Sequence, residues 1–238
     1  MSNEKETMNR VRLRGRIVFF VLYDNHAVID LRIMNERAVG AQTNRNAVSN
    51  TPRVYVFGDQ LDAVRMLKRG DRITVLGHAQ TSRDMRDGGI VADKILVADN
   101  SRLRAAFRAE SGDLSVPYAP DENVVLLRGA LGANRKKPND NMTVFNLDVS
   151  YLDDEGNERV AHPRLVAYNS TARMIDKMNE GDTIDVLGFV QTRDKEAKDE
   201  MPSEERRRYM PGRLGRDRSG KAVIHYQSFV CTSIEKVD

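Results

Sequence analysis

A duplicated segment is the feature of this sequence that most constrains its fold. Residues 51–83 and residues 162–194 align without a gap and share Pro-Arg near the start, Gly-Asp in the middle, then Val-Leu-Gly and Gln-Thr. An internal repeat of this kind indicates a structural unit that is used more than once in a chain. The sequence therefore predicts two similar domains.

Each copy of the repeat has the hydrophobic pattern of a strand, a helix and a second strand. Residues 53–57 alternate valine with arginine, tyrosine and phenylalanine, as expected of a strand with one buried and one exposed face. Apolar residues recur at helical spacing over 61–67, and Gly70 follows two basic residues, as is common just past a helix. Residues 73–79 return to a period of two, so the block closes with another strand.

Length and composition are those of a globular protein with two domains. The chain has 238 residues, of which 40% are hydrophobic and 31% charged, and no apolar stretch is long enough to span a bilayer. Residues 1–8 are expected to form a mobile arm without the features of a secretory signal, so we expect a cytoplasmic location. Cys231 is the only cysteine and lies in an apolar alternating run, which predicts a buried, unreactive thiol.

The first domain, residues 9–100, begins with a strand that carries four arginines on one side. Residues 9–17 alternate strictly between apolar and basic side chains. Like charges at neighbouring outward positions repel one another, so the run predicts a compensating anion such as a phosphate backbone. A solvated outer face is the alternative. The basic residues are Arg10, Arg12, Arg14 and Arg16.

The predicted elements of this domain follow the order strand, strand, strand, helix, strand, strand. This order is expected of an oligonucleotide-binding (OB) barrel, a small closed sheet whose face and loops commonly hold single-stranded nucleic acid. The sequence therefore predicts an all-β protein of two tandem five-stranded OB barrels. Each barrel should carry a helix between its third and fourth strands.

Four segments of the first domain resemble the bacterial single-stranded DNA-binding protein family. They are NRVRLRG, VYVFG, LKRGDRITVLGHAQT and IVADKI, and they extend the resemblance over residues 9–98. The resemblance implies a stacking aromatic at Phe57, and the repeat puts Tyr168 at the same position of the second domain. Family members with two barrels per chain pair two chains, so the resemblance also implies a homodimer of four barrels. Leu187 and Phe189 offer an apolar patch for that contact.

The chain departs from the family in two respects. It has no tryptophan, whereas the family usually carries tryptophans near the start of the third strand and after the fourth. Fewer stacking platforms imply weaker binding per barrel, or more use of arginine, whose planar guanidinium also stacks on bases. The chain ends SIEKVD without the family's acidic C-terminal tip, so we do not expect recruitment of replication partners by that route.

The second domain is expected at residues 123–238, after a linker at 101–122. Its first strand keeps only Arg128 of the arginine run, and the predicted loop after it supplies Lys136 and Lys137 instead. A long basic loop is predicted at 193–221, either as a flap that closes over DNA or as a solvated loop. Its central cluster comprises Arg206, Arg207, Arg208 and Tyr209.

Aromatic and basic side chains of both domains make up the predicted nucleic-acid-binding set. Bases stack on aromatic rings whatever their sequence, while lysine and arginine follow the phosphates. Besides the residues named above, the set contains Arg53, Tyr55, Arg83, Arg86, Arg164 and Arg193. The sequence has no motif of a catalytic site or a phosphate-binding loop, so we expect no catalytic activity, cofactor, metal or small-molecule substrate.

The sequence thus predicts largely sequence-independent binding and protection of single-stranded DNA in replication, recombination or repair. One alternative is a primosome-like or recombination accessory protein, in which the second domain mediates assembly instead of binding DNA. The balanced charge of that domain is consistent with this alternative. The other alternative is an RNA-binding OB protein, because nothing in the sequence distinguishes a ribose 2′-hydroxyl.

Overall fold

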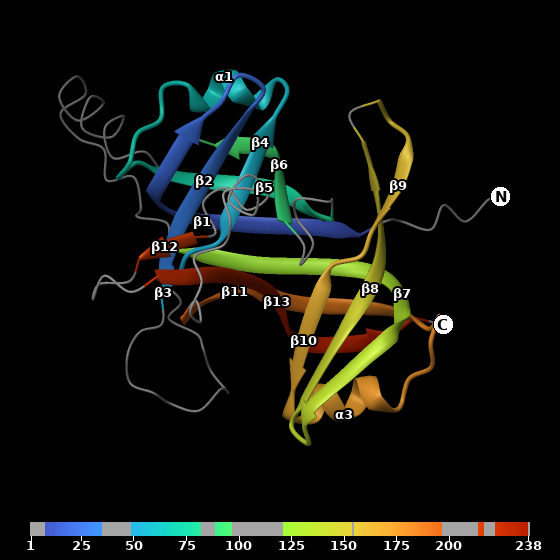
Figure 1. Cartoon of the computed structure of the whole chain (residues 1–238). Helices are drawn as coiled ribbons and strands as arrows, with labels where there is room; N and C mark the ends of the chain where they lie inside the picture. The colour runs from blue at the N-terminus through green and yellow to red at the C-terminus, as the bar shows by residue number, and fades with distance from the viewer. Residues whose placement is uncertain are drawn as a thin grey trace, which may run out of the picture.

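The computed structural model describes residues 8–34, 49–81, 89–96, 121–153, 155–196, 214–216 and 222–237. Most of these residues belong to β-strands, and two short helices lie at equivalent places of the repeat (Figure 1). The predicted all-β class is therefore confirmed. Most of the predicted N-terminal arm, linker and long basic loop lie outside the described residues.

Five strands of the N-terminal half close into a barrel. The elements are β1 (Asn9–Leu22), β2 (His26–Met34), β3 (Ser49–Asn50), β4 (Arg53–Phe57), α1 (Gln60–Val64), β5 (Arg72–Gln80) and β6 (Gly89–Leu96). β1 pairs with β2 and β5, β2 pairs with β4, β4 runs parallel to β6, and β6 returns to β5. The short β3 extends the sheet beside β2. The predicted closed five-stranded barrel is thus confirmed for these strands.

Five strands of the C-terminal half pair in the same cyclic order. The elements are β7 (Glu122–Asn139), β8 (Met142–Leu152), β9 (Glu158–Ala161), β10 (Arg164–Tyr168), α3 (Asn169–Asp176), β11 (Thr183–Glu196), β12 (Leu214–Arg216) and β13 (Ala222–Lys236). β7 pairs with β8 and β11, β8 pairs with β10, β10 runs parallel to β13, and β13 returns to β11. β9 lies beside β8, and β12 lies beside β13.

Strands of the C-terminal half are longer than the sequence pattern predicted. β7 continues to Asn139, so Lys136 and Lys137 lie on a strand and not in a loop. β11 continues to Glu196 and pairs along its whole length with β13. The first residues of the predicted loop at 193–221 therefore belong to a two-stranded extension of the barrel.

Alternate residues of the strands fill the interior of each barrel. Val54 of β4 and Leu165 of β10 are fully buried, and the residues before them are partly or fully exposed. Helix α1 contributes the buried Val64 and α3 contributes Ile175. α1 is shorter than the helical spacing predicted, because the chain leaves the helix after Val64 and buries Leu67 from the turn that follows.

The repeated Val-Leu-Gly triplet coincides with a β-bulge in each barrel. At Gly77 and at Gly188 the register with the neighbouring strand shifts by one residue. A Cβ atom at Gly77 would lie 2.1 Å from the carbonyl oxygen of Val91, and one at Gly188 would lie 2.2 Å from that of Val230. Only glycine permits this approach of two backbones, so both copies need it at this place.

The two barrels are joined edge to edge by the pairing of β1 with β7 (Figure 1). The pairing is antiparallel and puts Val11 opposite Val125, its counterpart when NRVRLRG is aligned with NVVLLRG. Antiparallel pairing of equivalent residues relates the two barrels by an approximate two-fold axis, as in an isologous contact between identical subunits. The pairing of β1 with β7 therefore has the symmetry of a contact between two copies of one barrel, although both strands belong to the same chain.

Hydrogen bonds on the two sides of this axis are reciprocal. The Thr51 amide donates to Oγ1 of Thr192 at 2.8 Å, and the His162 amide donates to Oγ1 of Thr81 at 2.8 Å. The repeat exchanges Thr51 with His162 and Thr81 with Thr192. The same contact is therefore made twice, once from each barrel.

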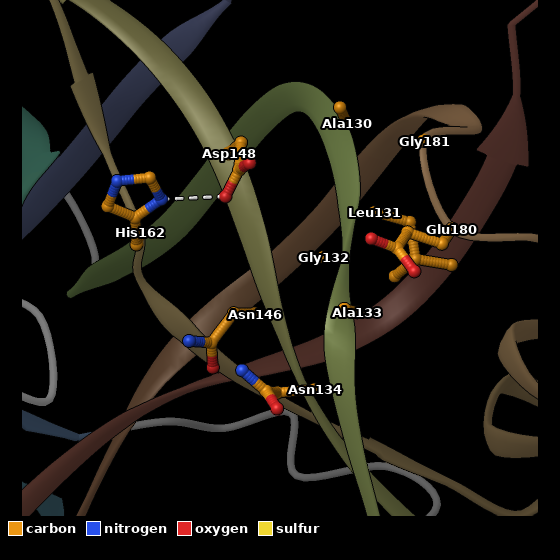
Figure 2. Close-up of a pocket in the computed structure, with 10 residues that line it drawn as sticks. All are labelled: Ala130, Leu131, Gly132, Ala133, Asn134, Asn146, Asp148, His162, Glu180 and Gly181. Atoms are coloured by element: carbon orange, nitrogen blue, oxygen red, sulfur yellow. Dashed lines mark hydrogen bonds and ion pairs between the residues drawn. The ribbon is translucent and has the colours of Figure 1, made fainter.

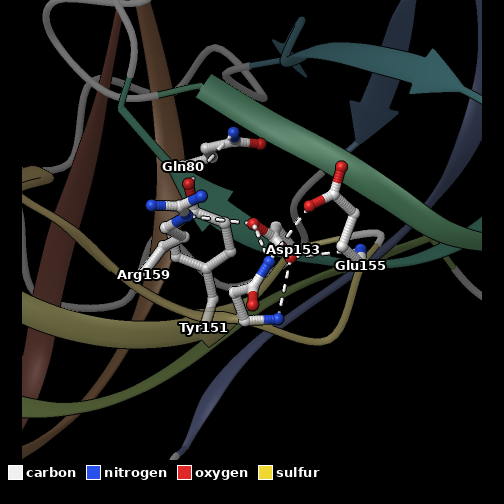
Figure 3. Close-up of polar contacts among 6 residues, drawn as sticks. Gln80, Tyr151, Asp153, Glu155 and Arg159 are labelled. Carbon is white, nitrogen blue, oxygen red and sulfur yellow. Dashed lines mark hydrogen bonds and ion pairs between the residues drawn. The ribbon is translucent and has the colours of Figure 1, made fainter.

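The β8–β9 hairpin extends from the second barrel to β5 of the first (Figure 3). Its Tyr151 ring stacks on His78 with the ring centroids 5.1 Å apart, and the Tyr151 hydroxyl accepts a hydrogen bond of 3.2 Å from Gln80 Nε2. In the hairpin turn, Asp153 accepts hydrogen bonds from the Asn157 amide and from Arg159, and these bonds lower the pKa of the carboxyl group. The charged turn thus keeps its shape while the hairpin stem holds the two barrels together.

Two further expectations concern burial and membranes. Cys231 is 4% exposed, as predicted, and burial raises the pKa of its thiol. Among the described residues, no helix has both the length and the apolar character needed to cross a bilayer.

Candidate nucleic-acid interface

Three rings form a ladder on the outer face of the first barrel, which we call the aromatic ladder: Tyr23, His26 and Phe57. The Tyr23 and His26 rings are 4.4 Å apart with 12° between their planes, and the His26 and Phe57 rings are 5.9 Å apart with 26° between theirs. Strand pairing sets His26 directly opposite Phe57. Tyr23 is 43% exposed and the other two rings are partly exposed, so the ladder offers solvent a surface on which a flat ring can stack.

The neighbouring row of the same face combines a ring with an ion pair. Phe19 lies opposite Asp30, and Asp30 lies opposite Arg53. Arg53 donates from Nε to Oδ1 and from Nη2 to Oδ2 of Asp30, both at 2.7 Å, and its guanidinium carbon is 5.6 Å from the centre of the Phe19 ring. Burial alone would lower the pKa of Arg53, but the bonds to Asp30 outweigh it and raise the pKa. Arg53 is therefore charged but neutralised by its partner.

Tyr55 lies on β4 between these two rows. It alternates with the buried valines of the strand and is partly exposed on the outer face. The predicted set of Arg53, Tyr55 and Phe57 therefore does share one surface.

The four predicted arginines of β1 lie on a different part of that strand, where it pairs with β5 and β7. Arg12 Nε is 3.0 Å and Arg14 Nη1 is 3.7 Å from Oε2 of Glu122. Arg16 donates a hydrogen bond of 2.9 Å to the carbonyl of Gly70. Glu122, the first residue of β7, thus balances part of the charge of these arginines from within the chain, where the sequence pattern predicted an external anion such as a phosphate backbone.

Two of the predicted cations of the second barrel are held by carboxylates. Arg128 donates to both oxygens of Asp185 at 2.6 and 2.7 Å, and these bonds lower the pKa of Asp185. Lys137 Nζ is 2.8 Å from Oδ2 of Asp176; although burial would raise the pKa of Asp176, the bond to Lys137 helps to lower it. Lys136 is exposed.

The predicted pair Tyr168 and Arg193 is brought together by the structure. Arg193 Nη2 donates to the Tyr168 hydroxyl at 2.5 Å and to Oε1 of Gln191 at 2.8 Å. Tyr226, opposite Arg193 on β13, is 39% exposed. The second barrel therefore presents fewer stacked rings than the first, and its best candidate cluster is built around one arginine.

Six residues of the predicted nucleic-acid-binding set are not among the residues that the structure describes. They are Arg83, Arg86, Arg206, Arg207, Arg208 and Tyr209.

Three aromatic residues of the candidate surface were not predicted from the sequence: Phe19, Tyr23 and His26. The bulge in β1 between Ile17 and Phe19 changes which residues face outward, so the alternation that began at residue 9 does not continue to Phe19. His26 comes beside Phe57 through the register between β2 and β4. The described side chains contain no cluster of three or more metal-ligating residues.

A closed five-stranded barrel with an exposed aromatic face is the architecture of OB-fold proteins. Comparison with solved structures agrees with this class. The chain is similar in fold to the crystal structure of the wild-type single-stranded DNA binding protein from Thermus aquaticus, with a TM-score of 0.57 and 17% identity over 98% of this chain and 94% of that chain. A deletion mutant of the same protein gives a TM-score of 0.55 and 17% identity over 98% and 95% of the two chains. No protein-family model and no curated protein sequence matches this chain.

Proposed function

We propose that this protein binds single-stranded DNA without strong sequence preference and performs no chemistry on it. In this proposal the chain consists of two tandem OB barrels that cover and protect the strand during replication, recombination or repair. The observation that carries the proposal is the aromatic ladder, which is formed by Tyr23 in the turn between β1 and β2, His26 of β2 and Phe57 of β4. The similar fold of the Thermus aquaticus protein, whose name states that it binds single-stranded DNA, supports the same function.

Stacking explains why such a site would accept any sequence. Every base has a flat face, and each base stacked on an aromatic side chain contributes about 1–3 kcal/mol. Stacked bases need a cation for the phosphates between them, and Arg32 is exposed on β2, the strand that carries His26. Binding should therefore weaken with rising salt concentration.

A titration of the full-length protein with labelled oligonucleotides tests this proposal. In the Phe57→Ala variant, the binding free energy for thymidine oligonucleotides should be less favourable by about 1–3 kcal/mol, because one stacking ring is lost. Met66→Ala is the matched control, since Met66 is 82% exposed after α1 and away from β1, β2 and β4. If wild-type protein binds no oligonucleotide, or if the two variants bind equally well, the proposal is wrong.

The assembly alternative is favoured by one observation, the pairing of Arg128 and Lys137 with carboxylates in the second barrel. If that barrel only mediates assembly, Tyr168→Ala combined with Arg193→Ala should leave the affinity for DNA unchanged. Under our proposal the double variant binds DNA more weakly and with a smaller dependence on salt. The Arg173→Ala variant on the exposed side of α3 serves as the control for loss of positive charge.

The RNA alternative requires a separate comparison. DNA and RNA oligonucleotides of the same sequence should be competed against one another on the wild-type protein. Tighter binding of the DNA supports our proposal, and tighter binding of the RNA supports the alternative.

The proposal includes a homodimer of four barrels. Apolar side chains are partly exposed on the outer face of β5, β1, β7 and β11, where the two barrels of one chain join; these are Leu76, Val124, Leu126, Leu187 and Phe189. Leu187 is 44% exposed, and strand pairing sets Leu126 beside it. Sedimentation should give twice the mass of one chain, and Leu187→Glu should reduce it to the mass of a monomer. A monomeric wild-type protein would remove this part of the proposal.

A further inference from the structure

The second barrel has a polar pocket where β7 bulges away from β8 (Figure 2). Leu131 pairs with Leu147 and Arg135 pairs with Phe145, so residues 132–134 of β7 are accommodated opposite Asn146 alone. The resulting space is about 450 Å³ and lies between the two strands. A bulge leaves backbone groups outside the regular ladder, and bulges are frequent beside functional sites.

Two side-chain amides project into this space, Asn134 from the bulge and Asn146 from β8 (Figure 2). No described residue makes a hydrogen bond to either amide, although each offers two donors and an acceptor. A side-chain amide without a hydrogen-bond partner in the protein can pair with a ligand that has a donor and an acceptor next to each other. The edge of a nucleobase has this pattern.

The equivalent row of the first barrel shows what is different here. In that barrel Asp30 lies opposite Arg53 and neutralises it with two hydrogen bonds. In the second barrel Asn146 lies opposite Arg164, so the carboxylate is replaced by an uncharged amide. Arg164 is exposed, and no described residue forms an ion pair with it. The second barrel therefore keeps on its outer face a cation that the first barrel has cancelled.

The remaining polar groups of the pocket are mainly acceptors. Oδ1 of Asp148 is 2.7 Å from Nδ1 of His162, and the other oxygen of Asp148 makes no hydrogen bond within the described part of the chain. Glu180 contributes a further carboxylate to the rim (Figure 2). Carboxylates repel phosphate but accept hydrogen bonds from the exocyclic amino group of cytosine. The pocket thus suits a base with an amino group, while Arg164 beside it suits the adjoining phosphate.

We propose that this pocket binds the edge of one unstacked, amino-bearing base of the single strand, with Arg164 on the neighbouring phosphate. The inference rests on the proposed function and adds to it a difference between the barrels. The first barrel holds bases by their faces through the aromatic ladder. The second barrel holds a base by its edge, so the protein carries a modest base preference.

Deoxycytidine and deoxyuridine oligonucleotides provide a matched pair of probes, because cytosine carries an amino group where uracil carries a carbonyl oxygen. We expect the full-length wild-type protein to prefer the cytidine oligonucleotide. The double variant Asp148→Asn/Glu180→Gln replaces carboxylates, which can only accept, with amides that can also donate to the uracil oxygen. It should reduce the ratio of the two dissociation constants by roughly fivefold, by weakening the binding of cytidine. Both side chains are on the surface, and an unchanged melting temperature will show that the variant is folded.

A second variant tests the role of charge. Asn146→Asp gives the second barrel the arrangement of the first, so the new carboxylate should neutralise Arg164. The salt dependence of binding should then fall by about 0.7 in slope, the value of one phosphate contact on a single strand. Asn157→Asp, in the exposed turn of the β8–β9 hairpin, adds the same charge elsewhere and should leave the slope unchanged.

The outcomes separate this inference from the proposed function. If Phe57→Ala weakens binding of both oligonucleotides but the double variant Asp148→Asn/Glu180→Gln leaves their ratio unchanged, the pocket does not read a base and only the inference is overturned. If the wild-type protein binds neither oligonucleotide, the proposed function and the inference both fail. A reduced ratio with a preserved affinity for uridine supports the inference.

Discussion

Arg53 forms a two-bond ion pair with Asp30 across the outer face of the first barrel, and both bonds measure 2.7 Å. The side chains are 11% and 15% exposed, so the pair is largely withdrawn from water. Such a pair holds its members in place but has little charge left for a phosphate. The guanidinium of Arg53 therefore contacts the Phe19 ring while its charge is largely balanced by Asp30.

Removal of one member of this pair should destabilise the protein. We expect Asp30→Asn to lower the free energy of unfolding by about 2 kcal/mol, because a mostly buried guanidinium loses its counter-charge. Urea denaturation measures the effect. Asp62→Asn is the control, since Asp62 and Arg65 form an ion pair whose side chains are 86% and 63% exposed, and its loss should change stability by less than about 0.5 kcal/mol. Equal effects of the two substitutions would contradict this account of Arg53.

The ion pair between Arg72 and Asp121 should matter even more. Arg72 Nη2 is 2.6 Å from Asp121 Oδ1, and the other oxygen of Asp121 accepts a bond from the Met34 amide at 2.7 Å. Asp121→Ala should cost about 3–5 kcal/mol, because it removes a largely buried carboxylate that lies beside the buried Arg72 guanidinium and accepts from the Met34 amide. Glu122→Ala, one residue along, removes a more exposed carboxylate and should cost less than about 1 kcal/mol. Thermal unfolding compares the two, and a smaller loss in Asp121→Ala would be evidence against the assigned role.

Acid should remove the contribution of the pair between Arg128 and Asp185. The hydrogen bonds from Arg128 lower the pKa of Asp185 in the folded state, so folding favours the ionised carboxylate. The stabilisation is complete above the ordinary pKa of about 3.9 and is lost as the pH falls through the lowered value. The difference in unfolding free energy between wild type and Asp185→Asn should therefore be constant near neutral pH and shrink below about pH 4. A difference that grows on acidification would show that the sign is wrong.

Glycine at the two β-bulges should be irreplaceable. Gly77→Ala forces a Cβ atom to within 2.1 Å of the Val91 carbonyl oxygen, so the strands must separate and lose ladder hydrogen bonds. We expect a loss of more than about 3 kcal/mol, well beyond the cost of an ordinary surface substitution. Gly132→Ala is the comparison, because its Cβ would lie 3.2 Å from the nearest atom, the Asn146 carbonyl oxygen. Circular dichroism melting of both variants would reveal whether the close approach is the cause.

The sequence predicted those parts of the molecule that depend on local pattern. The alternation around Val54 and Val56 correctly indicated which side of β4 is buried, so Tyr55 and Phe57 were recognised as outward residues. The repeat indicated the unit of architecture, because it contains the turn after the helix and the glycine of the bulge. These features are set by neighbouring residues and by backbone sterics, which can be inferred without a structure.

Pairings between distant segments could not be predicted in this way. Glu122 was assigned to a linker, but it begins β7 and reaches Arg12 and Arg14 only because β7 pairs with β1. His26 stands next to Phe57 only because of the register between β2 and β4. Ion pairs that neutralise candidate cations depend on this long-range register, so counting arginines overestimates the positive charge available to an anionic ligand.

The pairing of Val11 with Val125 has a consequence for how the two barrels can change over time. When identical subunits meet on a two-fold axis, every substitution is present in both subunits, so the two subunits cannot differ in the residues that they expose. Here the two halves of the contact are encoded by different parts of one chain. The first barrel therefore has aspartate at position 30 where the second barrel has asparagine at the equivalent position 146. Because each half of the contact has its own sequence, the two barrels can differ in their outer faces while the β1–β7 pairing that joins them is kept.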